Sequence, residues 1–143
     1  MRENTGLYRG KRIDNGEWVF GSLLKVEING VSAWLIFGSE FEVINGQVYS
    51  KEHANVIPET VGQYTGLTDK NGKKIFEGDI VKGLLLFGLP VLGVASFKDG
   101  AFGLAWQRGD VDEFSAFTSM CNVEYEVIGN IHDNPELLGG DSL

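Results

Sequence analysis

The chain has few of the residues that metal-binding, disulfide-bonded and membrane-embedded proteins need. Its 143 residues contain one cysteine, Cys121, which excludes an internal disulfide and any metal site built from several cysteines. Neither of its two histidines stands at a spacing typical of a zinc site. The most apolar stretch, residues 83–94, has about half the length of a membrane helix and contains Gly88 and Pro90. We therefore expect a cytoplasmic protein, with no membrane partner, no metal and no cofactor.

Positive charge is absent from the last quarter of the chain. Residues 1–108 hold 12 basic and 12 of the 20 acidic side chains, so the net charge of −8 comes entirely from residues 109–143. Such an acidic surface repels nucleic-acid phosphates, and it either suits a basic partner or keeps the protein soluble. The net charge therefore disfavours a nucleic-acid partner.

Turn signals divide the sequence into hairpins. Each signal is an Asn-Gly or Asp-Gly pair, and the pairs are Asn15-Gly16, Asn29-Gly30, Asn45-Gly46, Asn71-Gly72 and Asp99-Gly100. Asn or Asp followed by Gly tolerates the positive φ angles of a type I′ turn, and the flanking segments are rich in β-branched and aromatic residues. We predict a mainly antiparallel, hairpin-rich, all-β fold. The expected strands cover residues 17–28, 31–38, 41–44, 47–50, 75–81, 91–98, 101–106 and 123–132.

Helix is expected in one place, with a second candidate. Asn134 and Pro135 suit the start of a short C-terminal helix that ends before Gly139. Residues 112–121 are a candidate for another helical turn.

Two long motifs resemble the signature of the YopX family. They are residues 62–81 (GQYTGLTDKNGKKIFEGDIV) and residues 125–138 (YEVIGNIHDNPELL), and residues 8–19 and 56–61 resemble the opening of one branch of that family. The resemblance implies a phage or prophage protein in the cytoplasm of a bacterial host cell, with a C-terminal SH3-like barrel. It implies no activity and no catalytic residues. We accordingly expect an N-terminal β subdomain (1–60), an SH3-like β-barrel subdomain with a C-terminal helical turn (61–138) and a flexible tail (139–143).

Few residues are candidates for catalysis. Asp69 is expected to accept backbone hydrogen bonds in the turn at residues 68–73, and Gly78-Asp79 to shape a sharp strand entry. An enzyme would have to use the polar side chains of Glu77, Asp79, His132 and Asp133. No nucleophile motif accompanies them. We therefore predict no catalytic residues.

An apolar run is the first candidate for an interaction site. It is too apolar for an exposed loop, so it either fills the core or meets a partner. The candidate oligomer interface comprises Leu84, Leu85, Leu86, Phe87, Leu89, Val91 and Leu92. The acidic C-terminal region could also meet a basic hairpin tip of a neighbouring copy.

A basic patch is the second candidate. It comprises Arg9, Lys11, Arg12, Lys70, Lys73 and Lys74, and Tyr8 and Tyr64 lie near it in the sequence. Cations beside aromatic rings suit a single-stranded nucleic acid. Our preferred interpretation is a non-enzymatic phage accessory protein that forms a homo-oligomer or binds a host or phage protein. A nucleic-acid-associated role, through this patch or through an acidic end that mimics phosphates, ranks second, and an enzyme third.

Overall fold

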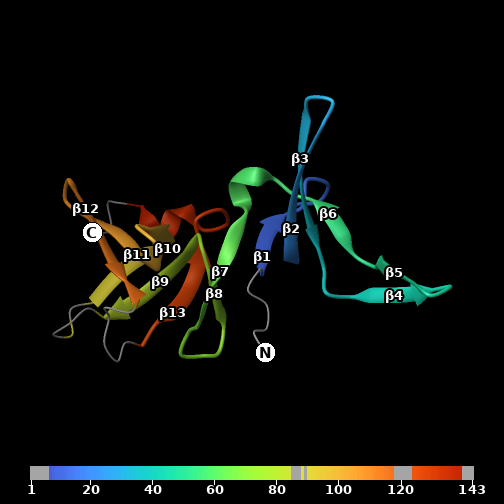
Figure 1. The fold of residues 1–143 in the computed structure, drawn as a ribbon. Coiled ribbons are helices and arrows are strands. Elements are labelled where there is room, and N and C mark those ends of the chain that lie inside the picture. Colours follow the sequence, from blue (N-terminus) through green and yellow to red (C-terminus); the bar gives the residue numbers. More distant parts are fainter. Residues whose placement is uncertain (1–6, 85–87, 89, 118–123, 140–143) are drawn as a thin grey trace. The chain divides into compact units, whose positions relative to one another are not determined.

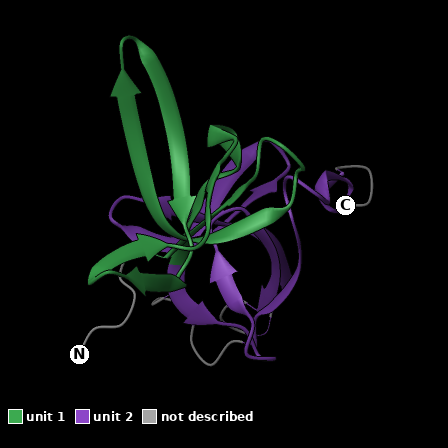
Figure 2. Ribbon diagram, turned by 90° about the vertical axis from the view of Figure 1, so that its right-hand side faces the viewer, with its two compact units in different colours: residues 1–64 green, residues 65–143 purple. Residues whose placement is uncertain are grey.

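The structure is a computed structural model that describes residues 7–84, 88, 90–117 and 124–139. It is all-β, as the turn signals predict, with antiparallel strands and short 3-10 turns among the described residues (Figure 1). The chain forms two compact units, unit 1 (Met1–Tyr64) and unit 2 (Thr65–Leu143), coloured separately in Figure 2. The subdomain limits expected from the sequence stay predictions, and residues 140–143 of the expected tail lie outside the described residues.

Unit 1 is built on one antiparallel sheet. Its elements are β1 (Tyr8–Lys11), β2 (Trp18–Ile28), β3 (Val31–Phe37), β4 (Phe41–Ile44), β5 (Gln47–Ser50), β6 (His53–Asn55), the 3-10 turn η1 (Pro58–Thr60) and the start of β7 (Gly62–Thr68). The strands lie in the order β6-β3-β2-β1-β7. The first part of β2 pairs with β1 up to Gly21, and the part after Gly21 pairs with β3. The buried core is made of Val19, Ile36, Ala54 and Val56.

The β4–β5 hairpin extends this sheet as a separate ribbon. Among the described strands, β4 and β5 pair with each other and with no third strand. The β3–β6 ladder leads into the hairpin through two backbone hydrogen bonds, from Gly38 N–H to the Glu52 carbonyl (2.9 Å) and from Lys51 N–H to the Glu40 carbonyl (3.0 Å). The hairpin therefore continues from the Phe37 end of β3.

Unit 2 contains a five-stranded sheet. Its elements are the end of β7, β8 (Lys74–Phe76), β9 (Asp79–Leu84), β10 (Pro90–Lys98), β11 (Ala101–Arg108), β12 (Val111–Ala116), β13 (Glu126–Asn130) and the 3-10 turn η4 (Pro135–Leu138). The sheet order is β12-β11-β10-β9-β13, over a core of Ile75, Val81, Ala95, Leu104 and Phe117. Within the described residues no pairing joins β12 to β13, so the sheet is open and the SH3-like barrel is not confirmed.

Three of the five turn signals form the expected geometry. Asn29, Asn45 and Asp99 have φ angles of 52°, 50° and 52°, and the glycine that follows each of them also has a positive φ. These are type I′ hairpin turns, which match the twist of the flanking strands. In the other two pairs only the glycine has a positive φ, so these turns are of another type.

The helical turn expected at residues 112–121 is wrong for residues 112–116, which lie in β12, whereas Phe117 has 3-10 conformation and residues 118–121 lie outside the described residues. Gly109 has a φ of 64° and reverses the chain after β11, so the next residues pair back as β12. The C-terminal helix is a single 3-10 turn with Pro135 at its start. The Asn134 side chain does not cap this turn, because its Oδ1 accepts a hydrogen bond from Asn130 N–H (3.2 Å).

In the part of the chain that the structure describes, no helix has the length and apolar composition that a membrane crossing requires.

Candidate interaction surface

The β2–β3 ladder in unit 1 has apolar side chains on both faces. Side chains alternate along a strand, and the face that carries Val19, Leu23 and Ile36 packs into the core. We call the opposite side the outer face: Phe20, Ser22, Leu24, Val26 and Ile28 on β2, and Val31, Ala33, Leu35 and Phe37 on β3. None of these nine positions carries a charge, whereas the solvent side of an antiparallel sheet ordinarily carries polar residues.

Four large side chains of the outer face are exposed. Phe20 and Leu24 are 48% and 49% exposed, and Ile28 and Val31, which pair beside the Asn29-Gly30 turn, are 63% and 68% exposed. Lys25, one residue from Leu24, belongs to the other face, where its Nζ lies 4.1 Å from the centre of the Trp34 ring. After Leu23, the alternation thus places Lys25 and Glu27 on one face of β2 and apolar side chains on the other.

The β4–β5 hairpin repeats this asymmetry on a smaller scale. Val43 pairs with Val48 and Phe41 pairs with Ser50, so Phe41, Val43 and Val48 share one side, which we call the hairpin face. They are 55%, 70% and 68% exposed. The other side carries the polar residues Glu42 and Gln47 together with Ile44 and Tyr49, which are 48% and 46% exposed. An isolated two-stranded hairpin is marginally stable in water, so this ribbon needs a covering surface.

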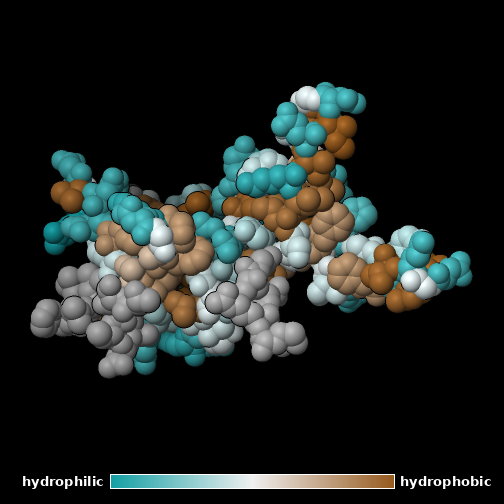
Figure 3. Space-filling model, in the orientation of Figure 1, coloured by the Kyte–Doolittle hydropathy of each residue, from teal (hydrophilic) through white to brown (hydrophobic). Residues whose placement is uncertain are grey.

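Exposed apolar surface is concentrated in unit 1. Among the described residues, ten of the fifteen exposed large hydrophobic side chains belong to it. Figure 3 shows hydrophobic atoms along both the β2–β3 and the β4–β5 arms. Large exposed apolar surfaces of this kind mark interaction sites.

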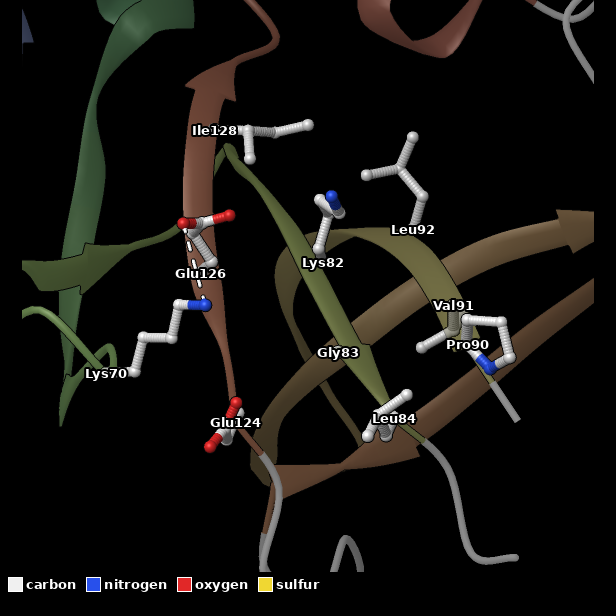
Figure 4. A pocket seen from close by; sticks show the side chains of 10 residues that line it. All are labelled: Lys70, Lys82, Gly83, Leu84, Pro90, Val91, Leu92, Glu124, Glu126 and Ile128. Atoms are coloured by element: carbon white, nitrogen blue, oxygen red, sulfur yellow. Dashed lines mark ion pairs between the residues drawn. The ribbon is translucent and has the colours of Figure 1, made fainter. Parts of the chain in front are cut away.

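The apolar run predicted as an oligomer interface is described only in part. Leu84, Val91 and Leu92 line one cavity of about 510 Å³ in unit 2, next to Lys82 and Ile128 (Figure 4). A 3.8 Å ion pair between Lys70 and Glu126 borders it. The other members, Leu85, Leu86, Phe87 and Leu89, lie outside the described residues. This interface stays a prediction.

The six residues of the predicted basic patch fall into two clusters, one in each unit. Arg9 is 6% exposed and its guanidinium lies 4.7 Å from the centre of the Trp18 ring. Arg12 makes two 2.9 Å hydrogen bonds to Asp14, which raise the pKa of Arg12 and lower the pKa of Asp14. In unit 2, Lys70 pairs with Glu126, and Lys73 and Lys74 follow the Asn71-Gly72 turn. Several of these cations thus have protein partners.

The polar residues considered for catalysis lie in turns that hydrogen bonds hold in place. Asp79 is 1% exposed, and its Oδ2 accepts a hydrogen bond from Phe76 N–H (2.8 Å), which closes the turn that contains Glu77. His132 and Asp133 lie in a turn ordered by Asn130, whose Oδ1 accepts hydrogen bonds from both of their N–H groups (3.0 and 2.9 Å). The described residues contain no group of three or more His, Cys, Asp or Glu that could hold a metal ion.

Comparison with known proteins identifies the family. The model of the YopX protein family matches residues 7–139. The chain belongs to the YopX family. Protein EF1440 from Enterococcus faecalis, known from a crystal structure, is 26% identical with a TM-score of 0.58, over 92% of this chain and 96% of that one. Protein yopX from Bacillus subtilis is 19% identical with a TM-score of 0.49, over 94% and 98% of the two chains. No curated protein matches the chain.

The two long motifs of this YopX chain meet at Asp69. Its Oδ1 accepts hydrogen bonds from the N–H groups of Asn71 and Lys73, each at 2.9 Å, as expected for the turn. Its Oδ2 accepts a 3.0 Å hydrogen bond from Val127 N–H at the start of β13, and Lys70 N–H donates to the Tyr125 carbonyl (2.9 Å). Burial raises the pKa of Asp69, but the three N–H donors outweigh it, and the pKa is lowered.

The apolar surface of unit 1 was missed by reasoning from the sequence. Its signal is present in residues 19–28, where both the odd and the even positions carry large apolar side chains (Val19, Leu23; Phe20, Leu24, Ile28). A strand with two apolar faces needs cover on both sides. The hairpin face of this YopX chain is harder to predict from the sequence, because strands of four residues show only a short alternating pattern.

Proposed function

We propose that this YopX protein is a non-enzymatic module that assembles with copies of itself through the apolar surface of unit 1. The observation that carries the proposal is the outer face, where Phe20, Leu24, Ile28 and Val31 are about half to two-thirds exposed on a sheet surface without charge. We place this activity in the cytoplasm of a bacterial host, as a phage or prophage accessory function, because the motifs at residues 62–81 and 125–138 resemble a phage-associated family.

Burial of the outer face provides too little free energy to hold a stable assembly by itself. Each of the four exposed side chains offers roughly 100 Å² of apolar surface, and covering it gains about 2.5 kcal/mol. The four together gain on the order of 10 kcal/mol, which is similar to the 4–15 kcal/mol that association costs in lost freedom. The outer face alone therefore supports weak assembly, and a stable assembly must also use a second surface.

Solution mass tests the proposal. We expect light scattering at micromolar concentration to give the wild type a mass above 15.7 kDa. Leu24→Glu should reduce it to a single chain, because assembly would bury an unpaired carboxylate. Lys25→Glu is the matched control, since it introduces the same side chain one residue away on the other face, and it should keep the wild-type mass. A wild type that remains a single chain would contradict the proposal.

The apolar run in unit 2 is tested in the same experiment. The double variant Leu86→Glu, Leu89→Glu should assemble like the wild type if unit 1 forms the interface. If this variant dissociates while Leu24→Glu does not, the interface is the one predicted from residues 84–92, and the assignment to unit 1 is wrong.

A nucleic-acid-associated role is the second candidate, supported by the clusters at Arg9, Lys11 and Arg12 and at Lys70, Lys73 and Lys74. The partners of Arg12 and Lys70, Asp14 and Glu126, compete with phosphate for them. Retention of single-stranded DNA that weakens steeply with salt would favour this role.

A further inference from the structure

We propose that two copies of this chain exchange their β4–β5 hairpins, so that the hairpin face of each copy covers the outer face of the other. This inference rests on the proposed function and adds to it the arrangement of the copies. The interface then consists of Phe41, Val43 and Val48 from one copy against Phe20, Leu24, Ile28 and Val31 from the other, and its two halves are related by a two-fold axis.

Connectivity keeps the hairpin away from the outer face of its own chain. The backbone hydrogen bonds Gly38–Glu52 and Lys51–Glu40 continue the β3–β6 ladder into β4 and β5. The hairpin therefore leaves from the Phe37 end of β3, whereas Ile28 and Val31 lie at the opposite end, beside the Asn29-Gly30 turn. Within unit 1, Figure 1 shows the β2–β3 and β4–β5 arms pointing in different directions. A second copy can supply a hairpin without breaking these hydrogen bonds.

The hairpin is shorter than the outer face. The β2–β3 ladder from Ser22–Phe37 to Ile28–Val31 contains seven pairs, which span about 23 Å, and the four pairs of β4–β5 span about 13 Å. The hairpin can therefore lie lengthwise on the outer face, with two sheet layers about 10 Å apart.

The distribution of polar side chains indicates which side of the hairpin is covered. The only polar side chains on the two joined surfaces are Ser22 and Ser50, and the Ser50 hydroxyl donates to the Glu52 carbonyl of its own chain (3.0 Å). Leu24, Ile28, Val31 and the hairpin face carry no charge, so a contact between them brings no desolvation penalty for a charge. Arg9, which pairs with Phe20, and His53, which stacks on Phe37, border the outer face. Covering the opposite side of the hairpin would bury Glu42 and the Gln47 amide, which accepts a 2.8 Å hydrogen bond from the Tyr49 hydroxyl. The pattern therefore leaves that side in water.

The buried area favours a reciprocal pair over a one-way contact. Seven exposed apolar side chains at roughly 100 Å² each give roughly 700 Å² for a single hairpin on a single face, which is the size of a crystal contact. A two-fold pair makes this contact twice and buries roughly 1,400 Å², within the range of about 1,200–2,000 Å² of stable interfaces. A ring in which each pair of neighbours makes one such contact stays below that range.

Site-directed cross-linking tests the exchange. In a Cys121→Ser background, a Leu24→Cys copy and a Val43→Cys copy are co-expressed with different tags and oxidised. We expect a disulfide-linked pair that carries both tags, because the hairpin face of one copy would lie on the outer face of the other. Each variant alone should give little product. Lys25→Cys with Val43→Cys is the matched control, and we expect about tenfold less product from it, because a disulfide needs Cβ atoms about 4 Å apart.

The outcomes separate this inference from the proposed function. A wild-type mass of two chains together with the Leu24–Val43 cross-link supports the exchange. The same mass without that cross-link overturns the exchange and leaves self-assembly in place. A single-chain wild type overturns both, and an assembly larger than two chains overturns the two-fold exchange. Val43→Glu, checked by circular dichroism, should lower the mass to one chain with the fold intact, since Val43 is 70% exposed and outside the core.

Discussion

The carboxylate of Asp69 joins parts of the chain that are far apart in the sequence. Two of its three N–H donors come from its own turn, and the third, Val127, lies 58 residues away. Asp69 is 7% exposed, so each donor would lose a buried partner if the carboxylate were changed. The turn at residues 68–73 is therefore also the attachment point of β13.

Asp69→Asn should destabilise unit 2. An asparagine keeps one acceptor oxygen for the turn. Its NH₂ group would face Val127 N–H, and because both are donors, a buried donor would remain without an acceptor. We expect the free energy of unfolding to fall by about 1.5–3 kcal/mol in urea titrations. Asp110→Asn, in the exposed β11–β12 turn, is the control and should change it by no more than about 0.5 kcal/mol.

The same substitution should change the acid sensitivity of the protein. The folded pKa of Asp69 is lowered, so its stabilising effect is complete above the unfolded pKa of about 3.9 and is lost as the pH falls through the folded pKa. The difference in unfolding free energy between wild type and Asp69→Asn should therefore be constant from neutral pH down to about pH 5 and shrink below about pH 4. A difference that stays constant into strong acid would show that the carboxylate charge is not what the three N–H groups stabilise.

At the scale of the element, β2 depends on one glycine. Gly21 lies where β2 changes its partner from β1 to β3, and a Cβ atom at this position would lie 1.8 Å from the Phe37 carbonyl oxygen. The backbone at Phe37 and Gly38, at the end of β3, therefore approaches β2 at a point that has room for no side chain.

Gly21→Ala should disrupt unit 1. The clash is with backbone, so the β2–β3 ladder must move apart, and we expect a loss of about 2–4 kcal/mol in unfolding free energy. Gly16→Ala is the control, because Gly16 also has a positive φ (74°) but no atom within 4 Å of the added Cβ, and it should cost about 1 kcal/mol. Urea unfolding followed by the fluorescence of Trp18 and Trp34 measures both. Equal losses in the two variants would contradict the steric argument.

The elements were largely predictable from the sequence because their signals are local. The Asn29-Gly30, Asn45-Gly46 and Asp99-Gly100 turns follow from the φ preferences of two adjacent residues, and the flanking strands follow from them. The strand β12 was missed because its turn, at Gly109, lacks the Asn-Gly or Asp-Gly order. The Asp69–Val127 contact depends on which distant strands pair, and so does the exposure of one side of the β2–β3 ladder. No local sequence pattern predicts this pairing.

At the scale of the whole molecule, charge and exposed apolar surface lie in different parts of the chain. The uncompensated acids lie at residues 109–143, in unit 2, whereas the charge-free outer face and hairpin face belong to unit 1. Two kinds of association are therefore distinguishable in solution. Contacts through unit 1 depend on apolar burial, and contacts between the acidic region and a basic hairpin tip depend on charge.

Salt dependence distinguishes these two kinds of contact. Screening weakens charge-driven association, since the Debye length falls from about 10 Å at 0.1 M to about 3 Å at 1 M salt. Burial of the outer face involves no charge, so we expect the dissociation constant from sedimentation equilibrium to change by less than about twofold over this range of sodium chloride. Sodium sulfate should tighten the assembly, because excluded salts strengthen apolar burial. Leu24→Glu should stay a single chain throughout, whereas a wild-type assembly that dissociates as sodium chloride increases would place the contact on the charged regions instead.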